Sequence, residues 1–167
     1  ANDNLIFDGN SFILDKNGSK IKQLKSFSED LCSWDIEQTK PQKNKFEKSE
    51  LSSIFDALVL GVRDYAKKCG FKTALIGLSG GIDSALVSAI ATAALGSKNI
   101  FCVSMPSKWS SSHSKSDAKD LASRLKINFN SIPIENLMSS FEESFINSIS
   151  FEMAEITNQN IQSRIRG

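Results

Sequence analysis

The stretch TALIGLSGGIDSALVSAIATAAL, residues 73–95, decides the fold of this chain. It starts as an apolar run, breaks at Ser79-Gly80-Gly81, and continues from Asp83 with the spacing of a helix. A buried strand that passes through a glycine turn into a helix is the opening of a βαβ unit. The chain around this stretch is therefore expected to form an α/β domain.

The segments that follow repeat this alternation. Apolar strands are predicted in residues 72–78, 99–105 and 127–134, with helices over residues 83–95 and 114–126 between them. Apolar strands separated by helices are typical of a parallel sheet covered by helices on both faces. We therefore predict a Rossmann-like open parallel sheet of nucleotide-binding type.

The N-terminal part has a different pattern. Residues 4–24 alternate with period two around the turn candidates Asp8-Gly9 and Asn17-Gly18, which predicts short strands in a β-hairpin. Residues 39–48 are polar and charged and include Pro41, as is typical of a linker. Apolar side chains at helical spacing then predict a helix over residues 49–69, with Gly70 as its C-cap.

Composition limits the classes of partner. The 167 residues are 40% hydrophobic and carry a net charge of +1, so no global field attracts nucleic acid or an anionic membrane. The three cysteines, Cys32, Cys69 and Cys102, lie far apart without metal-ligand spacing, which argues against a disulfide framework or a zinc site. No signal peptide or membrane-spanning run is evident, so a cytoplasmic location is expected.

The LSGGIDS break lies where the first strand ends and the first helix begins. The first amides of a helix are unpaired and its dipole is positive there, so this position suits an anion. Gly80 and Gly81 allow a sharp turn and a close approach of the ligand, while Ser79 and Ser84 add hydroxyl donors. Asp83 would repel a phosphate unless a cation lay between them, which indicates a phosphate with Mg²⁺.

Two common phosphate-binding loops do not fit this sequence. The loop lacks the Gly-Lys-Ser/Thr ending of a P-loop, and its glycines do not fall as GxGxxG. A loop that holds phosphates with backbone and serines suits a pyrophosphate that leaves as a unit, as in adenylation of a carboxylate. The alternative is a tight βα turn that binds nothing.

The SGGIDS motif is similar to the loop signature of the N-type ATP pyrophosphatases, whose fold is of the adenine nucleotide alpha hydrolase type. Three segments resemble the NAD synthetases in particular: residues 76–91 around the loop, MPSKWSS at 105–111, and NQNIQSRIRG at 158–167. Gln159 and Ser163 are mild departures, since the family usually has Glu and Ala there. Residues 5–31 resemble the last hairpins of a nitrilase-like glutaminase domain, with a decorative hairpin as the alternative.

This resemblance implies a domain organisation. Residues 1–38 would be the tail of a glutaminase domain, 39–48 a linker, and 49–167 the first half of the synthetase domain. The parallel sheet would then be incomplete. We expect the chain to be a fragment that is inactive alone, and a homodimer or larger assembly is expected.

The resemblance also implies a reaction and a set of site residues. ATP would adenylate deamido-NAD, and ammonia from glutamine would then displace AMP to give NAD. Asp83 would bind Mg²⁺ and serve catalysis, while Asn160 and Arg164 would contact deamido-NAD. The residues implied in binding ATP and pyrophosphate are Gly77, Leu78, Ser79, Gly80, Gly81, Ile82, Asp83 and Ser84.

Two other functions remain open from the sequence. Another pyrophosphatase, such as a GMP synthetase, would take a different second substrate, and a non-catalytic module of the same fold would only bind an adenine nucleotide. His113 lies in a serine-rich loop without a catalytic pattern, and a surface position is expected for it. Residues 107–112 are either a lid over ATP or an ordinary flexible loop.

Overall fold

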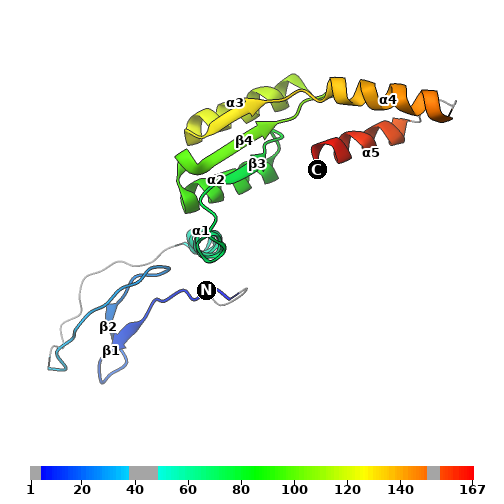
Figure 1. Ribbon diagram of the computed structural model, residues 1–167. Coiled ribbons are helices and arrows are strands. Elements are labelled where there is room, and N and C mark those ends of the chain that lie inside the picture. Colours follow the sequence, from blue (N-terminus) through cyan, green and yellow to red (C-terminus); the bar gives the residue numbers. More distant parts are fainter. Residues whose placement is uncertain (1–4, 38–48, 150–154) are drawn as a thin grey trace. The chain divides into compact units, whose positions relative to one another are not determined.

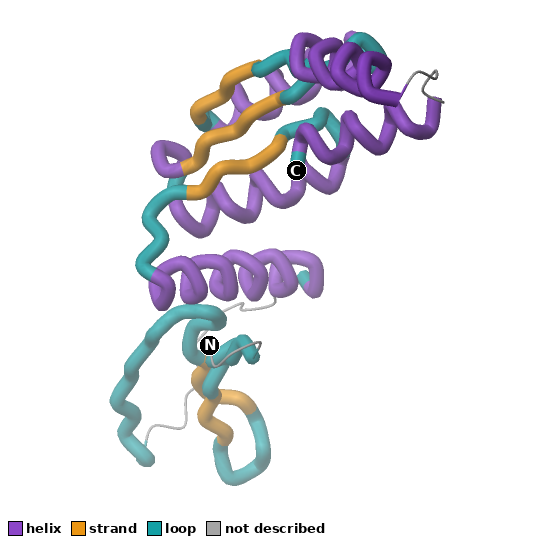
Figure 2. Tube along the Cα trace, turned by 45° about the vertical axis from the view of Figure 1, so that its right-hand side comes forward, coloured by secondary structure: helices purple, strands orange, loops and turns teal. Residues whose placement is uncertain are grey.

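The computed structural model describes residues 5–37, 49–149 and 155–167. The chain divides into two compact units, Ala1–Gly70 and Phe71–Gly167, and each is described by itself. Figures 1 and 2 show the helices and strands of both. The predicted linker over residues 39–48 lies outside the described residues.

A short antiparallel hairpin occupies the first unit. It consists of β1 (Phe12–Leu14) and β2 (Lys20–Gln23). The carboxylate of Asp15 holds the turn between them, because it accepts hydrogen bonds from the amides of Asn17 and Ser19, each at 2.8 Å. The hairpin predicted around Asn17-Gly18 is thereby confirmed.

The helix of this unit, α1 (Glu50–Cys69), has caps at both ends. The Ser49 hydroxyl accepts a hydrogen bond from the Ser52 amide at 3.3 Å. At the other end Gly70 adopts a left-handed conformation with φ of 74°, and its amide donates to the carbonyl of Ala66. Both the helix and its glycine C-cap agree with the sequence-based prediction.

The second unit is built on a three-stranded parallel sheet. Strands β3 (Ala74–Gly77), β4 (Ile100–Ser104) and β5 (Asn128–Ser131) lie in the order β3-β4-β5. The connections run through α2 (Ile82–Leu95) and α3 (Ser112–Leu125), with a short 3₁₀ turn, η1, after α2. This is the α/β fold with a parallel sheet that the alternating pattern predicts.

One face of this sheet carries the core. Ile100 and Cys102 of β4 are fully buried against Ala91 of α2 and against Ala118 and Ala122 of α3. The alanines on α3 are four residues apart and therefore share one helix face, where their small side chains let the helix approach the sheet closely. Both crossover helices thus pack into a single cluster.

The opposite face is open in the described part of this unit. Leu75 and Phe101, which are neighbours across β3 and β4, are 74% and 41% exposed. Successive residues of a strand point to opposite faces, which is why these two alternate with the buried Ile100 and Cys102. The sequence predicted helices on both faces, whereas α2 and α3 cover one.

Two further helices complete the unit. Helix α4 (Glu135–Ile149) packs against α5 (Glu155–Arg166), and the C-terminal end of α5 returns toward the carboxyl ends of β3 and β4 (Figure 1). This return brings the C-terminal motif next to the turn after β3. No helix in the described part of the chain is long and apolar enough to cross a membrane.

The buried thiol of Cys102 gives a test of this packing. Burial raises the pKa of Cys102, although a contact with the Ser88 hydroxyl at 3.7 Å opposes the rise. A raised pKa keeps the thiol protonated, so at pH 8 the folded protein should react with maleimide at the exposed Cys69 and not at Cys102. Peptide mapping by mass spectrometry measures both, and unfolding in guanidinium should release Cys102. Equal labelling of the two thiols in the folded protein would contradict this core.

Candidate functional site at the carboxyl edge of the sheet

The turn between β3 and α2 is fixed by a backbone contact at Gly80. This residue has φ of +86°, which favours glycine. A Cβ atom built on it would lie only 2.8 Å from the Cα of Ser114, in the first turn of α3. Glycine is therefore required at this position for two reasons: the positive φ disfavours other residues, and the Ser114 backbone leaves no room for a side chain. The contact joins the N-terminal ends of α2 and α3.

Two serine hydroxyls brace the inside of this turn. Ser84 Oγ accepts a hydrogen bond from the Ser79 amide at 3.3 Å and donates one to the Gly81 carbonyl at 3.0 Å. Ser79 Oγ accepts from the Gly81 amide at 3.2 Å and lies 3.1 Å from Ser84 Oγ. The sequence suggested these hydroxyls as donors to a ligand, whereas in this structure they hold the turn together.

The start of α2 leaves backbone donors available. Its N-cap, Gly81, has no side chain to accept from the first turn. The amides of Ile82, Asp83 and Ser84 have no hydrogen-bond partner among the described residues. These donors and the positive end of the helix dipole suit a bound anion.

Asp83 lies in this first helical turn and is exposed. A carboxylate there is favoured by the helix dipole whether or not it binds a metal. Within residues 5–37, 49–149 and 155–167, no three His, Cys, Asp or Glu side chains come together as a metal site. Mg²⁺ commonly uses only one or two carboxylates together with phosphate oxygens and water, so Asp83 fits a phosphate-bound Mg²⁺ and not a metal held by protein alone.

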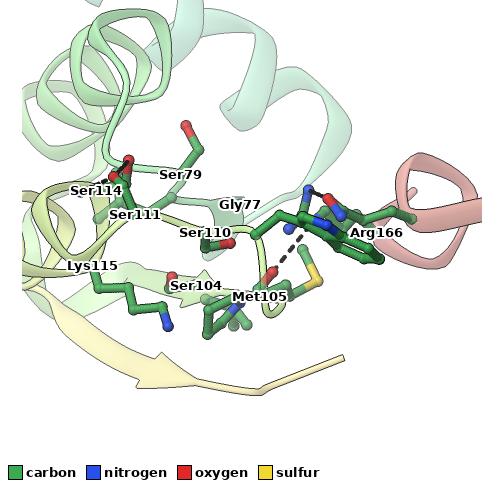
Figure 3. A pocket seen from close by; sticks show the side chains of 14 residues that line it. Gly77, Ser79, Ser104, Met105, Ser110, Ser111, Ser114, Lys115 and Arg166 are labelled. Carbon is green, nitrogen blue, oxygen red and sulfur yellow. Dashed lines mark hydrogen bonds between the residues drawn. The ribbon is translucent and has the colours of Figure 1, made fainter. Parts of the chain in front are cut away.

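A cavity of about 580 Å³ opens beside the turn (Figure 3). Gly77, Leu78 and Ser79 of the predicted loop line it, and the loop after β4 forms another wall. The remaining predicted loop residues, 80–84, are not among its lining residues. The predicted loop therefore divides between a cavity wall and the open end of α2.

The cavity is cationic. Lys115 from the first turn of α3 and Arg166 from the end of α5 line it, and none of its lining residues is Asp or Glu. Figure 3 shows these two side chains at opposite ends of the cavity, with Ser104, Met105 and Ser110 between them. Lys115 adds its charge at the positive end of a helix dipole, so this side of the cavity favours an anionic ligand.

An aromatic residue forms part of the cavity wall. The Trp109 side chain is 51% exposed, and the Lys108 ammonium lies 4.4 Å from its ring centroid. An exposed indole is a surface on which a planar ring can stack. Ser107 of the same loop is buried, and His113 lies exposed on α3 as expected. The cavity thus combines serine hydroxyls, two cations and an aromatic wall.

The C-terminal motif meets the loop after β4 through residues that the sequence did not single out. Gln162 Nε2 donates to Ser107 Oγ at 3.0 Å, and Arg166 Nε donates to the Met105 carbonyl at 3.0 Å. Arg166 Nη1 also donates to Gln162 Oε1 at 2.8 Å. The predicted ligands Asn160 and Arg164 are exposed and line none of the described cavities. Asn160 and Arg164 lie on one face of α5, and Gln162 and Arg166 lie on another. The spacing of these residues along the helix is the sequence signal that could have separated the residues facing the cavity from the exposed ones.

The parallel sheet, the open start of α2 and the cationic cavity at its carboxyl edge define an α/β protein of nucleotide-binding architecture. The profile of the NAD synthase family matches residues 54–167, and the chain belongs to this family. It is 43% identical to the glutamine-dependent NAD(+) synthetase of Synechocystis sp., over its whole length and 31% of that protein.

Solved structures give the same result. A glutamine-dependent NAD+ synthetase from Acinetobacter baumannii, in complex with ADP, matches with a TM-score of 0.83 and 35% identity, over 96% of this chain and 31% of that one. An NH3-dependent NAD synthetase from Campylobacter jejuni matches with a TM-score of 0.62 and 27% identity, over 71% and 49%. The chain therefore spans about 31% of the glutamine-dependent relatives named here.

The contact at Gly80 predicts a sharp difference between two glycine substitutions. Gly80→Ala should weaken pyrophosphate binding by the whole protein more than tenfold, because the new methyl group meets the Ser114 backbone and displaces the turn. Gly70→Ala is the matched control, since φ there is also positive but a Cβ atom meets nothing within 4 Å. Both changes strain the backbone by about 1–3 kcal/mol, so calorimetric titration separates strain from steric displacement. Equal affinities in the two variants would contradict the geometry of the turn.

Proposed function

We propose that the whole protein converts deamido-NAD to NAD by ATP-dependent amidation through an adenylated intermediate. The observation that carries this proposal is the SGGIDS turn, whose open helix amides lie beside a cationic cavity in a chain of the NAD synthase family. The family match also favours this reaction over a GMP synthetase or a binding module without chemistry.

ATP is the proposed first substrate. Residues 77–84 hold its phosphates, with the amides of Ile82, Asp83 and Ser84 directed to the pyrophosphate group. Lys115 and Arg166 add positive charge along the cavity, in place of the lysine that this loop lacks. The A. baumannii relative was solved in complex with ADP, which supports the binding of an adenine nucleotide.

Mg²⁺ is the proposed metal, with Asp83 as its ligand from this chain. A bound Mg²⁺ would neutralise charge on the phosphate oxygens. The Asp83 carboxylate is exposed, and no group of three possible metal-ligating side chains occurs among the described residues. Both observations support an ion that is held largely by phosphate. We therefore expect Asp83 to act in catalysis through the metal.

Deamido-NAD is the proposed second substrate, contacted by Asn160 and Arg164 on the exposed face of α5. Its nicotinate carboxylate attacks the α-phosphorus of ATP, and pyrophosphate leaves. Ammonia then attacks the carbonyl of the adenylate, AMP leaves, and the proton lost by nitrogen passes to solvent. The guanidinium of Arg164 is suited to a carboxylate or phosphate of this dinucleotide.

Glutamine is the proposed source of the ammonia. The glutamine-dependent relative from Synechocystis matches the whole chain, whereas the NH3-dependent relative from C. jejuni matches 71% of it. This difference supports the assignment of residues 1–38 to the tail of a glutaminase domain, 39–48 to a linker and 49–167 to the synthetase domain. A homodimer or larger assembly in the cytoplasm belongs to the same proposal.

The test is an assay of the whole protein with ATP, deamido-NAD, Mg²⁺ and glutamine. NAD should form with glutamine, and it should also form when ammonium is supplied as the nitrogen source in place of glutamine. Asp83→Asn should lower the rate most at limiting Mg²⁺, with little effect on folding, because a first-turn carboxylate contributes only about 0.3–1 kcal/mol to a helix. Glu50→Gln, which changes the first-turn carboxylate of α1, is the control and should keep the wild-type rate. The absence of NAD would refute the function, and an Asp83→Asn rate equal to wild type would refute the metal role.

A further inference from the structure

We propose that Gln162 and Arg166 are positioning residues that hold the loop after β4 in the shape that binds ATP. The inference rests on the proposed function, and it divides the C-terminal motif between two tasks. Asn160 and Arg164 are proposed to address deamido-NAD from one face of α5. Gln162 and Arg166 serve the nucleotide cavity from the opposite face.

Helix geometry separates the two pairs. Each residue of an α-helix turns the chain by about 100°, so residues four apart lie within about 40° of each other and residues two apart are about 200° apart. Asn160 and Arg164 therefore share a face, and Gln162 and Arg166 share the opposite one. The structure agrees, since only the second pair has hydrogen bonds to the loop after β4 among the described residues.

The contacts form a closed chain of hydrogen bonds. Arg166 connects the Met105 carbonyl to Gln162 Oε1, and Gln162 Nε2 continues to the Ser107 hydroxyl. Both ends of the Gln162 amide are thus engaged, which fixes its orientation. The Ser107 side chain that receives this contact is only 1% exposed, so water does not readily replace Gln162 there.

The segment that this chain of bonds holds is a wall of the cavity. Met105, Trp109 and Ser110 line the cavity, and the Ser107 amide donates to Ser110 Oγ at 3.0 Å. Loss of the Gln162 contact would therefore release Ser107 and, through it, the position of Ser110. The predicted result is weaker nucleotide binding, with the face of α5 that carries Arg164 unchanged.

Four variants of the whole protein test this role. Gln162→Leu keeps the size of the side chain and removes both hydrogen bonds, so the Kd for ADP and the KM for ATP should rise about tenfold. The KM for deamido-NAD should stay within about twofold. Gln162→Glu should recover part of this loss, because its carboxylate accepts from Arg166 and from the Ser107 hydroxyl, although it adds a negative charge to the cavity that Gln162 lines. Ser163→Ala, an exposed neighbour on α5, is the control and should change nothing.

The fourth variant tests the other end of the contact. Ser107→Ala should raise the Kd for ADP to a similar extent, and combining it with Gln162→Leu should add little, since the two residues act through one contact. This variant also keeps the test decisive if Gln162→Leu does not fold.

Two outcomes would overturn the positioning role. One is an unchanged Kd for ADP in both Gln162→Leu and Ser107→Ala. The other is an equal rise in the KM for ATP and for deamido-NAD without rescue by Gln162→Glu. If the wild-type protein binds ADP and makes NAD, either outcome leaves the proposed function standing. A wild-type protein that neither binds ADP nor makes NAD would instead reject the proposed function.

Discussion

The contact between Gly80 and the backbone of Ser114 is the constraint on which the rest of the site depends. It brings the first turn of α3 against the turn that begins α2, at a distance that excludes any side chain at residue 80. Two helix N-termini consequently lie together at the carboxyl edge of one sheet. Each adds its positive end to the same region, and Lys115 adds a full charge.

The site is assembled from segments that are distant in the sequence. The loop after β4 is held on one side by the amides of Ile132 and Ile134, which donate to the carbonyls of Ser104 and Pro106 at 2.8 and 3.0 Å. On its other side it is held by the side chains of α5. The cavity therefore has its shape only when the segment after β5 and the C-terminal helix are both in place. Ligand binding at the cavity therefore depends on the correct packing of both of these segments.

Local patterns predicted most of the fold. The apolar run before Ser79, the double glycine and the helical spacing after Asp83 act over a few residues, so β3, the turn and α2 follow from the sequence directly. The helix ending at Gly70 follows in the same way from its apolar spacing and its C-cap. Cover on both faces of the sheet was predicted from apolar strands, but strand composition does not say which helices supply that cover. Helices α2 and α3 both pack on one face, and Leu75 and Phe101 on the other face are exposed.

The site was predicted less completely, because its parts meet only through tertiary packing. Asn160 and Arg164 were selected by resemblance, and their roles stay predictions. Gln162 and Arg166 stand in the same motif, yet the contact with Met105 and Ser107 depends on where α5 returns to the sheet. Nothing in the sequence distinguishes Lys115 from the other lysines, and only the position of α3 in the fold shows that it lines the cavity.

A crystal structure of the whole protein with pyrophosphate bound would show whether the open start of α2 holds phosphate. Phosphate oxygens should lie within hydrogen-bond distance of the amides of Ile82, Asp83 and Ser84, with the turn at Gly80 still against Ser114. Pyrophosphate bound elsewhere, with those three amides turned away from it, would show that the start of α2 is not the phosphate site.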